Sequence, residues 1–382
     1  MENKNAIHRF LPVLLGFFVM GLVDLVGIST NYVKQDFGLS DTVSNLLPMS
    51  LFLWFAILSI PTGLIANKIG RKKTVILSMA ISFIAMILPL LVYNFPVMLI
   101  AFSLLGIGNT IIQVSLNPLV GDVVNENRLT SSLTLGQFVK AIAAFLGPII
   151  AGWAAIQFGN WKYVFLIFGI VTLLSGLWLQ LTRIEEKPVD QSVSSFKGTF
   201  SLLNDKIILM LFVGILFVVG VDVGLNTTIP KFLMERVEIP LEQAGLGTSL
   251  YFIARTIGTF IGAILLTKFS GRKLFVVSML VAIPALIIML VVPNLWTILV
   301  LIFVVGFAVA NVFSIIFAAA LKRMPERANE ISGLLITGVA GGAIFPFIMG
   351  VVSDFWGQTV GMAILLVALS YLLYCAFRMK EG

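Results

Sequence analysis

Ionisable side chains in the middle of long apolar segments carry most of the chemical information in this sequence. Two acidic residues, Asp24 and Asp222, and two basic residues, Lys140 and Arg255, each stand near the centre of such a segment. A charge at the centre of a bilayer costs at least ~2.5–3.5 kcal/mol, so each group needs a partner or a water-filled cavity. The charges of the two acids and the two bases cancel. This balance favours one shared cavity of low net charge over static ion pairs that tie helices together.

Amide side chains accompany these charges at helical spacing. The residues that share a helix face are Asp24 with Asn31, Gln113 with Asn117, Gln137 with Lys140, and Asp222 with Asn226; Asn311 adds an amide to a later segment. Such stripes combine hydrogen-bond donors and acceptors, and a sugar hydroxyl both donates and accepts. The pattern therefore predicts binding of a polyhydroxylated ligand. The alternative is hydrogen bonding between helices, worth only ~0.6 kcal/mol per bond.

The elements that position these residues follow from composition. Of 382 residues, 59% are hydrophobic and 11% are charged, against roughly 25% charged in an average soluble domain. This composition excludes a soluble enzyme, a nucleic-acid-binding protein and a disordered scaffold. The sequence predicts an all-α membrane protein with twelve transmembrane helices, because its apolar runs are continuous and about 20 residues long. The predicted spans are 10–32, 43–66, 74–93, 97–121, 131–156, 161–181, 207–233, 242–267, 273–292, 295–320, 330–354 and 358–377.

The distribution of lysine and arginine predicts the orientation. With a cytoplasmic N-terminus, 19 of the 25 basic residues fall in inside segments, four in outside segments and two within spans. We therefore expect both termini in the cytoplasm. The polar connection 183–206 divides an N-terminal six-helix half, 1–182, from a C-terminal half, 207–382. Asp24 and Asp222 occupy similar places in the two halves. Two parallel six-helix repeats joined by a cytoplasmic linker are typical of a secondary transporter.

The segment after the second span strengthens this interpretation. Gly63-Leu-Ile-Ala-Asn67-Lys68-Ile-Gly70-Arg71-Lys72-Lys73 resembles the loop signature of the major facilitator superfamily, G-x-x-x-D-R-x-G-R-R-K. The resemblance implies a gating loop that contains Gly63, Asn67, Gly70 and Arg71. Asn67 replaces the usual aspartate, which removes one charge from the latch of that loop.

Further stretches are similar to the fucose:proton symporter family, which includes the glucose/galactose permeases. They are Gln113-Val-Ser-Leu-Asn117-Pro118, Val219-Gly-Val-Asp222-Val-Gly224, Tyr251 with Gly258 and Gly262, Ile316-Phe-Ala-Ala-Ala-Leu-Lys322, and Gly341-Gly-Ala-Ile-Phe-Pro-Phe-Ile-Met-Gly350. The resemblance implies the major facilitator fold and uptake of a monosaccharide, a hexose or fucose-like sugar, across the inner membrane by alternating access. It also implies coupling to a proton, although Gln113 stands where the family has a glutamate linked to coupling.

Asp24 is the predicted coupling residue. A carboxyl group in a cavity can be neutral at one stage of transport and charged at another, and Lys140 is expected to pair with its ionised form. Sodium coupling and uncoupled facilitation remain alternatives, as does an efflux antiporter for drugs or metabolites. With one histidine and one cysteine, we expect no metal site, no cofactor and no enzymatic activity. The expected partners are the sugar, the coupling ion and the lipid bilayer, without nucleic acid, and we expect a monomer.

Overall fold

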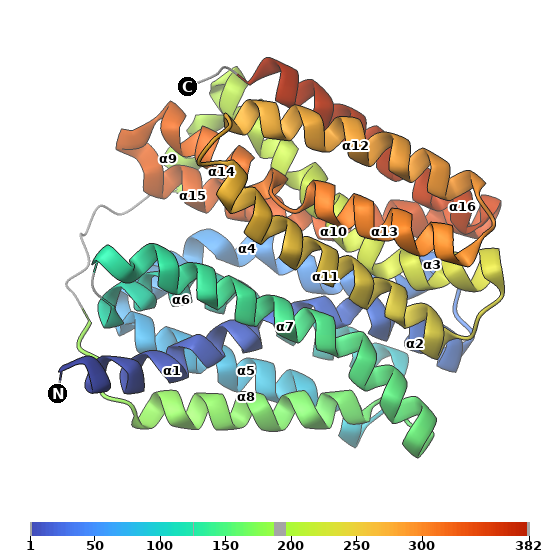
Figure 1. Ribbon diagram of the computed structural model, residues 1–382. Coiled ribbons are helices and arrows are strands. Elements are labelled where there is room, and N and C mark those ends of the chain that lie inside the picture. The colour runs from blue at the N-terminus through green and yellow to red at the C-terminus, as the bar shows by residue number, and fades with distance from the viewer. Residues whose placement is uncertain (1, 125, 187–195, 380–382) are drawn as a thin grey trace. The chain divides into compact units, whose positions relative to one another are not determined.

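A computed structural model describes residues 2–124, 126–186 and 196–379 (Figure 1). Within these ranges the chain forms helices and no strand. The elements are α1 (Glu2–Gly21), η1 (Leu22–Asp24), α2 (Leu25–Phe37), α3 (Asp41–Ser44), α4 (Leu46–Ile69), α5 (Arg71–Leu91), α6 (Phe95–Val123), α7 (Glu126–Phe158), α8 (Tyr163–Leu181), α9 (Phe196–Ser201), η2 (Leu202–Asn204), α10 (Lys206–Val237), α11 (Leu241–Leu265), α12 (Gly271–Val291), α13 (Leu295–Val309), α14 (Val312–Arg323), η3 (Pro325–Arg327), α15 (Ala328–Thr337), η4 (Gly338–Ala340) and α16 (Gly341–Arg378).

The helices confirm the predicted all-α membrane architecture. Eleven helical stretches among the described residues are long and apolar enough to cross a membrane. The last of them, Glu330–Arg378, contains the predicted spans 330–354 and 358–377. The backbone of Gly357, with φ 81° and ψ 171°, is not helical, so a kink at this residue divides α16 into two helices. The eleven stretches therefore account for the twelve spans expected from hydropathy.

Several spans are interrupted where the sequence predicted continuous helices: the 3-10 turn η4 lies within the span predicted at 330–354, and two other interruptions lie at predicted site residues. The first span changes at Leu22–Asp24 into the 3-10 turn η1, which separates α1 from α2. The span predicted at 295–320 is interrupted between α13 and α14, where Asn311 has φ −102° and ψ −6°. Apolar periodicity could not show either interruption, because the residues around them are as hydrophobic as the rest of the span. In transporters such discontinuous helices are found at substrate and ion sites.

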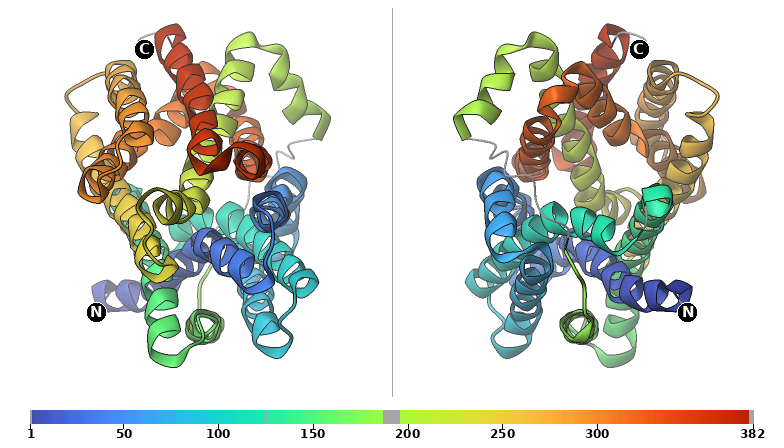
Figure 2. Two further views of the ribbon diagram at one scale, coloured as in Figure 1. Left: turned by 90° about the vertical axis from the view of Figure 1, so that its right-hand side faces the viewer. Right: turned by 90° about the vertical axis from the view of Figure 1, so that its left-hand side faces the viewer.

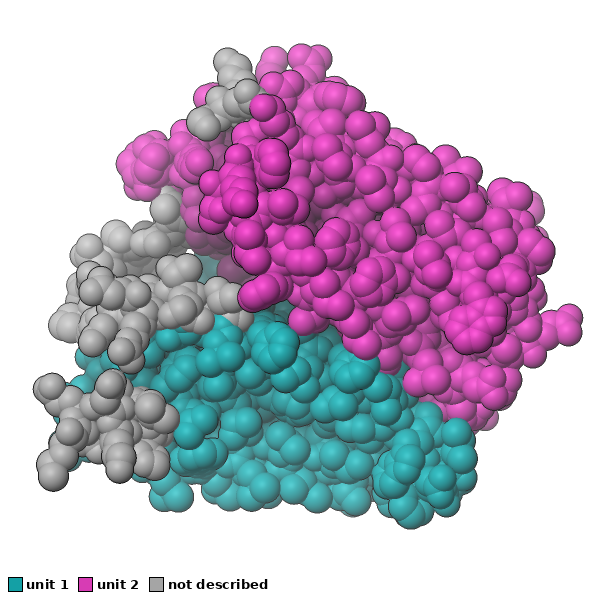
Figure 3. All heavy atoms as spheres, in the orientation of Figure 1, with its two compact units in different colours: residues 1–25, 53–193 teal, residues 26–52, 194–382 magenta. Residues whose placement is uncertain are grey.

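Contacts divide the chain into two compact units, coloured separately in Figure 3. Unit 1 contains residues 1–25 and 53–193, and unit 2 contains residues 26–52 and 194–382. The segment 26–52 therefore packs with the C-terminal part of the chain. The predicted linker 183–206 connects the two units, and its residues 187–195 lie outside the described ranges.

Unit 1 is built on two pairs of closely packed helices. In the first pair, α5 lies on α6, and in the second α1 lies on α7, with α8 against both α5 and α1. Fully buried aromatic side chains, including Phe17, Phe102 and Phe165, fill the space between them. Gly21 lies so close to the backbone carbonyl of Lys140 that a Cβ atom at this position would overlap it. The absence of a side chain at Gly21 thus brings α1 and α7 together beside Asp24.

Unit 2 is organised around the contact between α10 and α16, and Figure 2 shows its helices from two further directions. Gly341 of α16 lies against the carbonyl of Leu216 in α10, and Gly220 of α10 lies against the ring of Phe345. Small residues let helix backbones approach closely, which is how membrane helices gain packing energy without a hydrophobic driving force. The interface fixes α10, and with it Asp222 and Lys231.

Candidate functional site

The centre of α10 carries a partly exposed ion pair. One nitrogen of the Arg255 guanidinium, Nη1, lies 2.7 Å from Oδ1 and 2.6 Å from Oδ2 of Asp222. The hydroxyl of Tyr251 donates to the same Oδ1 at 2.7 Å. The Arg255 and Asp222 side chains are 31% and 23% exposed, so the pair is not sealed between helices. The structure therefore brings together the two predicted site residues of unit 2 and adds the hydroxyl of Tyr251.

Arg255 and Tyr251 lie on α11, four residues apart, and so share a helix face toward α10. Tyr251 is fully buried, and its ring lies 6.0 Å from the guanidinium carbon of Arg255. The buried tyrosine holds one carboxylate oxygen in a fixed position. The resulting carboxylate–guanidinium pair has no net charge and presents both hydrogen-bond donors and acceptors.

The predicted amides of unit 2 are buried between helices. The Asn31 amide nitrogen donates to the carbonyls of Gly27 at 2.7 Å and Thr227 at 3.0 Å. The Asn226 side chain lies directly against Gly27. Both side chains thus connect α2 to α10. Asn311 also links two elements: its amide, between α13 and α14, donates to the carbonyl of Gly258 in α11 at 2.7 Å.

In unit 1 the predicted coupling residues lie on neighbouring elements. Asp24 ends η1 and Lys140 lies on α7, whose backbone touches Gly21; both side chains are half-buried. The Gln113 amide, also half-buried, donates to Oδ1 of Asn109 at 2.8 Å. Asn117 and Gln137 are exposed.

Sequence reasoning missed Asn109, whose own amide donates to the carbonyl of Met20 at 2.7 Å. Asn109 is buried and stands one helical turn before Gln113 in an otherwise apolar run. That spacing was the available signal. Asn109 links α6 to α1 just before η1, and its side-chain oxygen holds the amide of Gln113.

The predicted gating loop is held by acidic residues that lie far from it in sequence. Gly70 has φ 93°, and the backbone N–H groups of Arg71 and Lys72 that follow it donate to the Glu186 carboxylate at 2.5 and 3.1 Å. The Arg71 guanidinium also pairs with Asp122 at 2.7 Å. These two acids provide negative charge to a loop that lacks the usual aspartate. Gly63 lies in α4, and the side chain of Asn67 lies outside the described residues.

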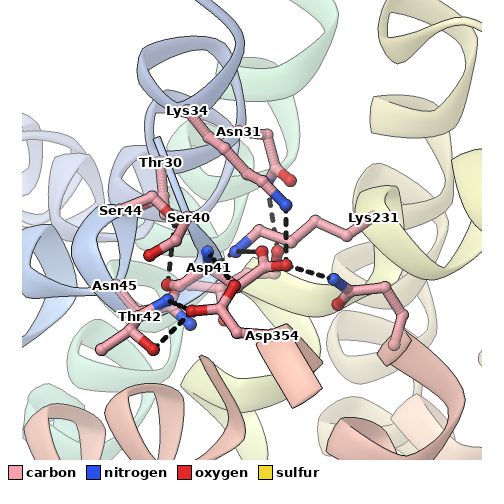
Figure 4. Close-up of polar contacts among 12 residues, drawn as sticks. Thr30, Asn31, Lys34, Ser40, Asp41, Thr42, Ser44, Asn45, Lys231 and Asp354 are labelled. Carbon is pink, nitrogen blue, oxygen red and sulfur yellow. Dashed lines mark hydrogen bonds and ion pairs between the residues drawn. The ribbon is translucent and has the colours of Figure 1, made fainter. Parts of the chain in front are cut away.

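A second polar cluster, which sequence reasoning missed, surrounds the start of α3 (Figure 4). We define the Asp41 cluster as Lys34, Asp41, Asn45, Lys231, Asp354 and Gln358. Lys34 lies 2.7 Å from Oδ2 of Asp41, and Lys231 lies 2.9 Å from Oδ1. Gln358 donates to Oδ2 at 2.7 Å. All members belong to unit 2, and they connect α2, α3 and Asn45, which directly follows α3, to α10 and α16.

The remaining contacts of the Asp41 cluster fix its backbone. The Asp354 carboxylate accepts from the N–H groups of Asp41 at 2.6 Å and Thr42 at 2.8 Å, at the N-terminus of α3. The Asn45 amide donates to the carbonyl of Pro346 at 2.6 Å, and its oxygen accepts from Lys231 at 3.2 Å. A signal for this cluster was present in the repeat, since the spacing from Thr30 to Lys34 recurs from Thr227 to Lys231.

Metal ligation has no support among the described residues, where no three His, Cys, Asp or Glu side chains form a group that could hold an ion.

Comparison with known proteins identifies the family. The sequence profile of the Major Facilitator Superfamily matches residues 13–241 and 210–381. The chain belongs to this superfamily. A glucose/galactose transporter of Brucella abortus is 22% identical over 392 residues, which cover 98% of this chain and 94% of that protein. A probable sugar efflux transporter of Helicobacter pylori is 22% identical over 389 residues, 99% of this chain and 98% of that one.

Among solved structures, the E. coli fucose:proton symporter superimposes on this member of the superfamily with a TM-score of 0.71, at 18% identity, over 99% of this chain and 100% of that one. The predicted membership of the superfamily and the resemblance to the fucose and glucose/galactose permeases are thus confirmed. This superfamily member is a multi-pass membrane transporter rather than an enzyme.

Proposed function

We propose that this protein imports a neutral monosaccharide, a hexose or a fucose-like sugar, by alternating access. The observation that carries the proposal is the partly exposed Asp222–Arg255 pair in the middle of the membrane-spanning region. A carboxylate and a guanidinium that neutralise each other suit an uncharged ligand rich in hydroxyl groups, because they provide acceptors and donors without net charge. The name of the similar glucose/galactose transporter of B. abortus supports the same class of substrate.

We propose that Gln113, Asn117, Gln137 and Lys140 contribute to sugar binding, with Asn31, Asn226 and Asn311 supporting the helices that carry Asp222 and Arg255. We also propose the halves 1–182 and 207–382 as the two transport domains, the linker 183–206 between them, and a monomeric protein in the inner membrane with both termini in the cytoplasm. Gly63, Asn67, Gly70 and Arg71 would form the cytoplasmic gating loop.

Proton coupling is assigned to Asp24. Its place on the 3-10 turn of a discontinuous helix, beside α7 and Lys140, supports this role. Asp24 and Lys140 would pair when Asp24 is ionised and separate when it binds a proton. Sodium coupling and uncoupled facilitation are the alternatives, and the experiment below separates them.

The test is uptake of radiolabelled glucose, galactose and fucose into proteoliposomes that contain the purified protein. An imposed proton gradient, a sodium gradient and no gradient are compared. We expect accumulation above equilibrium only with the proton gradient, and equilibration without accumulation for Asp24→Asn. Asp222→Asn should abolish binding of all three sugars. Full pH-driven accumulation by Asp24→Asn would show that coupling resides elsewhere.

Sugar efflux is the second candidate, because the probable sugar efflux transporter of H. pylori has the same 22% sequence identity to this chain as the glucose/galactose transporter has. The same vesicles, equilibrated with equal sugar concentrations on both sides and then given an inward proton gradient, distinguish the two directions. An exporter would lower the internal sugar concentration below the external one under these conditions, whereas a symporter would raise it.

A further inference from the structure

The Asp41 cluster contains four ionised groups whose charges cancel. Lys34 of α2 and Lys231 of α10 carry two positive charges, and Asp41 of α3 and Asp354 of α16 carry two negative ones. These are the charged groups that face Asp41 from the elements packed around it. Glu235, one turn beyond Lys231, contributes indirectly, because its carboxylate accepts the backbone N–H of Gln358 at 3.0 Å.

The four groups differ in their access to water. The side chains of Asp41 and Lys231 are 7% and 5% exposed, whereas that of Lys34 is 30% exposed. Lys34 can turn into solvent if its partner changes. Lys231 cannot reach water unless the helices around it move apart. Its ammonium group depends on Asp41 at 2.9 Å for a countercharge and on Asn45 at 3.2 Å for a hydrogen bond.

We propose that Asp41 is a second proton-binding site of this transporter, and that binding of a proton there releases α2 and α3 from α10 and α16. A proton from water adds to one carboxylate oxygen of Asp41 and removes its negative charge. Lys231 is then a buried cation without its countercharge, which is strongly unfavourable. Separation of the helices lets Lys231 and the protonated Asp41 reach water, so the proton favours the released state.

This site is distinct from the coupling role proposed for Asp24. By linkage, a ligand shifts an equilibrium only by its difference in affinity for the two states. The held state pairs Asp41 with two lysines and therefore disfavours the proton, and the released state accepts it. The orientation proposed above, in which the loop between α2 and α3 faces outward, would make external acidity the signal that opens this end of the protein.

The experiment measures a distance across the cluster in purified protein without sugar. Nitroxide labels are attached to cysteines at Gln35 on α2 and Phe355 on α16, both exposed, in a Cys375→Ala background, because Cys375 is the one cysteine of the chain. Double electron–electron resonance between pH 7 and pH 3, a range that includes the titration of a carboxyl group exposed to water, is expected to show one short distance at high pH. A longer distance should become populated as the pH falls.

Three variants test the cause of this response. Asp41→Asn should populate the long distance at both pH values, with the ratio of held to released protein reduced on the order of 100-fold. Adding Lys231→Gln to Asp41→Asn removes both buried charges and should restore the short distance at every pH. Asp354→Asn is the matched control: it removes an exposed carboxylate of the same cluster, and the pH response should persist.

A pH response that survives in Asp41→Asn would overturn the proposal, as would a folded double variant that remains in the long-distance state. If the double variant does not fold, Lys231→Gln alone decides the matter. Lys34 still compensates Asp41 in that protein, and protonation no longer leaves a buried cation, so the pH response should disappear. Its persistence would refute the proposal. Because no sugar is present, these outcomes do not depend on the substrate or on Asp24.

Discussion

The ion pair between Arg71 and Asp122 holds the predicted gating loop. The burial of each side chain predicts how much its partner's replacement should lower the free energy of unfolding. The side chain of Asp122, near the end of α6, is 1% exposed, whereas that of its partner Arg71, at the start of α5, is 19% exposed. Two contacts of 2.7 and 2.9 Å join the Arg71 guanidinium to the two carboxylate oxygens. Replacing Arg71 therefore leaves a buried carboxylate, whereas replacing Asp122 leaves a partly exposed guanidinium.

Arg71→Met leaves a buried carboxylate without its guanidinium, which should lower the free energy of unfolding by about 3–5 kcal/mol. Asp122→Asn keeps an oxygen that accepts a hydrogen bond, and the guanidinium left behind is partly exposed and can turn toward water. The cost in that direction should be only about 1–2 kcal/mol. Replacing both residues, as Arg71→Met with Asp122→Leu, removes the pair and should return the stability to within about 1 kcal/mol of the wild type.

The free energy of unfolding can be measured by titrating SDS into protein held in mild detergent micelles, with far-UV circular dichroism as the signal. Transport by the same variants, in the proteoliposomes described above, shows whether the loop also controls turnover. Equal losses of stability for Arg71→Met and Asp122→Asn would refute the burial argument. A double variant as unstable as Arg71→Met would show that the site requires charge rather than neutrality.

Two further predictions concern a glycine of α16 and the acidic residue that caps α10. Gly341→Ala should strongly destabilise the protein, because the new methyl group would overlap the backbone of α10. The matched change Gly63→Ala meets no atom within 4 Å and should stabilise α4 by about 0.5–1 kcal/mol; thermal unfolding in detergent compares the two. At the start of α10, burial raises the pKa of Asp205, but the backbone N–H of Ile208 and the Arg323 guanidinium lower it by more, so the net pKa falls below its ordinary value. Asp205 thus stabilises the fold above the pKa of the unfolded chain, and this contribution is lost as the pH falls through the lower folded pKa. Asp205→Asn, which keeps a capping side chain, should therefore show a smaller loss of thermal stability upon acidification than the wild type does; an equal loss in both proteins would contradict this account.

Several features of the candidate site could be predicted from the sequence because they depend on a single segment. A charged residue within twenty apolar ones is recognisable without any knowledge of its neighbours, and for that reason Asp222 and Arg255 could be proposed as site residues. Their direct contact in the structure agrees with the idea that each needed a partner. The hydroxyl of Tyr251 could not be assigned in the same way, since tyrosine is common in apolar helices and its bond to Asp222 depends on how α11 faces α10.

Amides were harder to interpret. Asn31, Asn226 and Asn311 have the spacing expected of residues that line a binding site, and the structure places all three between helices. Spacing along one helix defines a face but does not show what that face meets. An amide that donates to a carbonyl of the next helix and one that donates to a sugar have the same sequence pattern.

The sequence by itself determined the membrane-spanning helices, their number and the class of protein. It could do so because the transfer of each apolar segment into lipid depends on the composition of that segment alone. Only the tertiary structure decided which charges meet: Asp41 with Lys231, Arg71 with Asp122, and the N-terminus of α5 with Glu186. These partners are distant in sequence, and each pair depends on how whole helices dock. How two helices dock depends on the fit between side chains of both helices, so the sequence of one segment alone does not determine it.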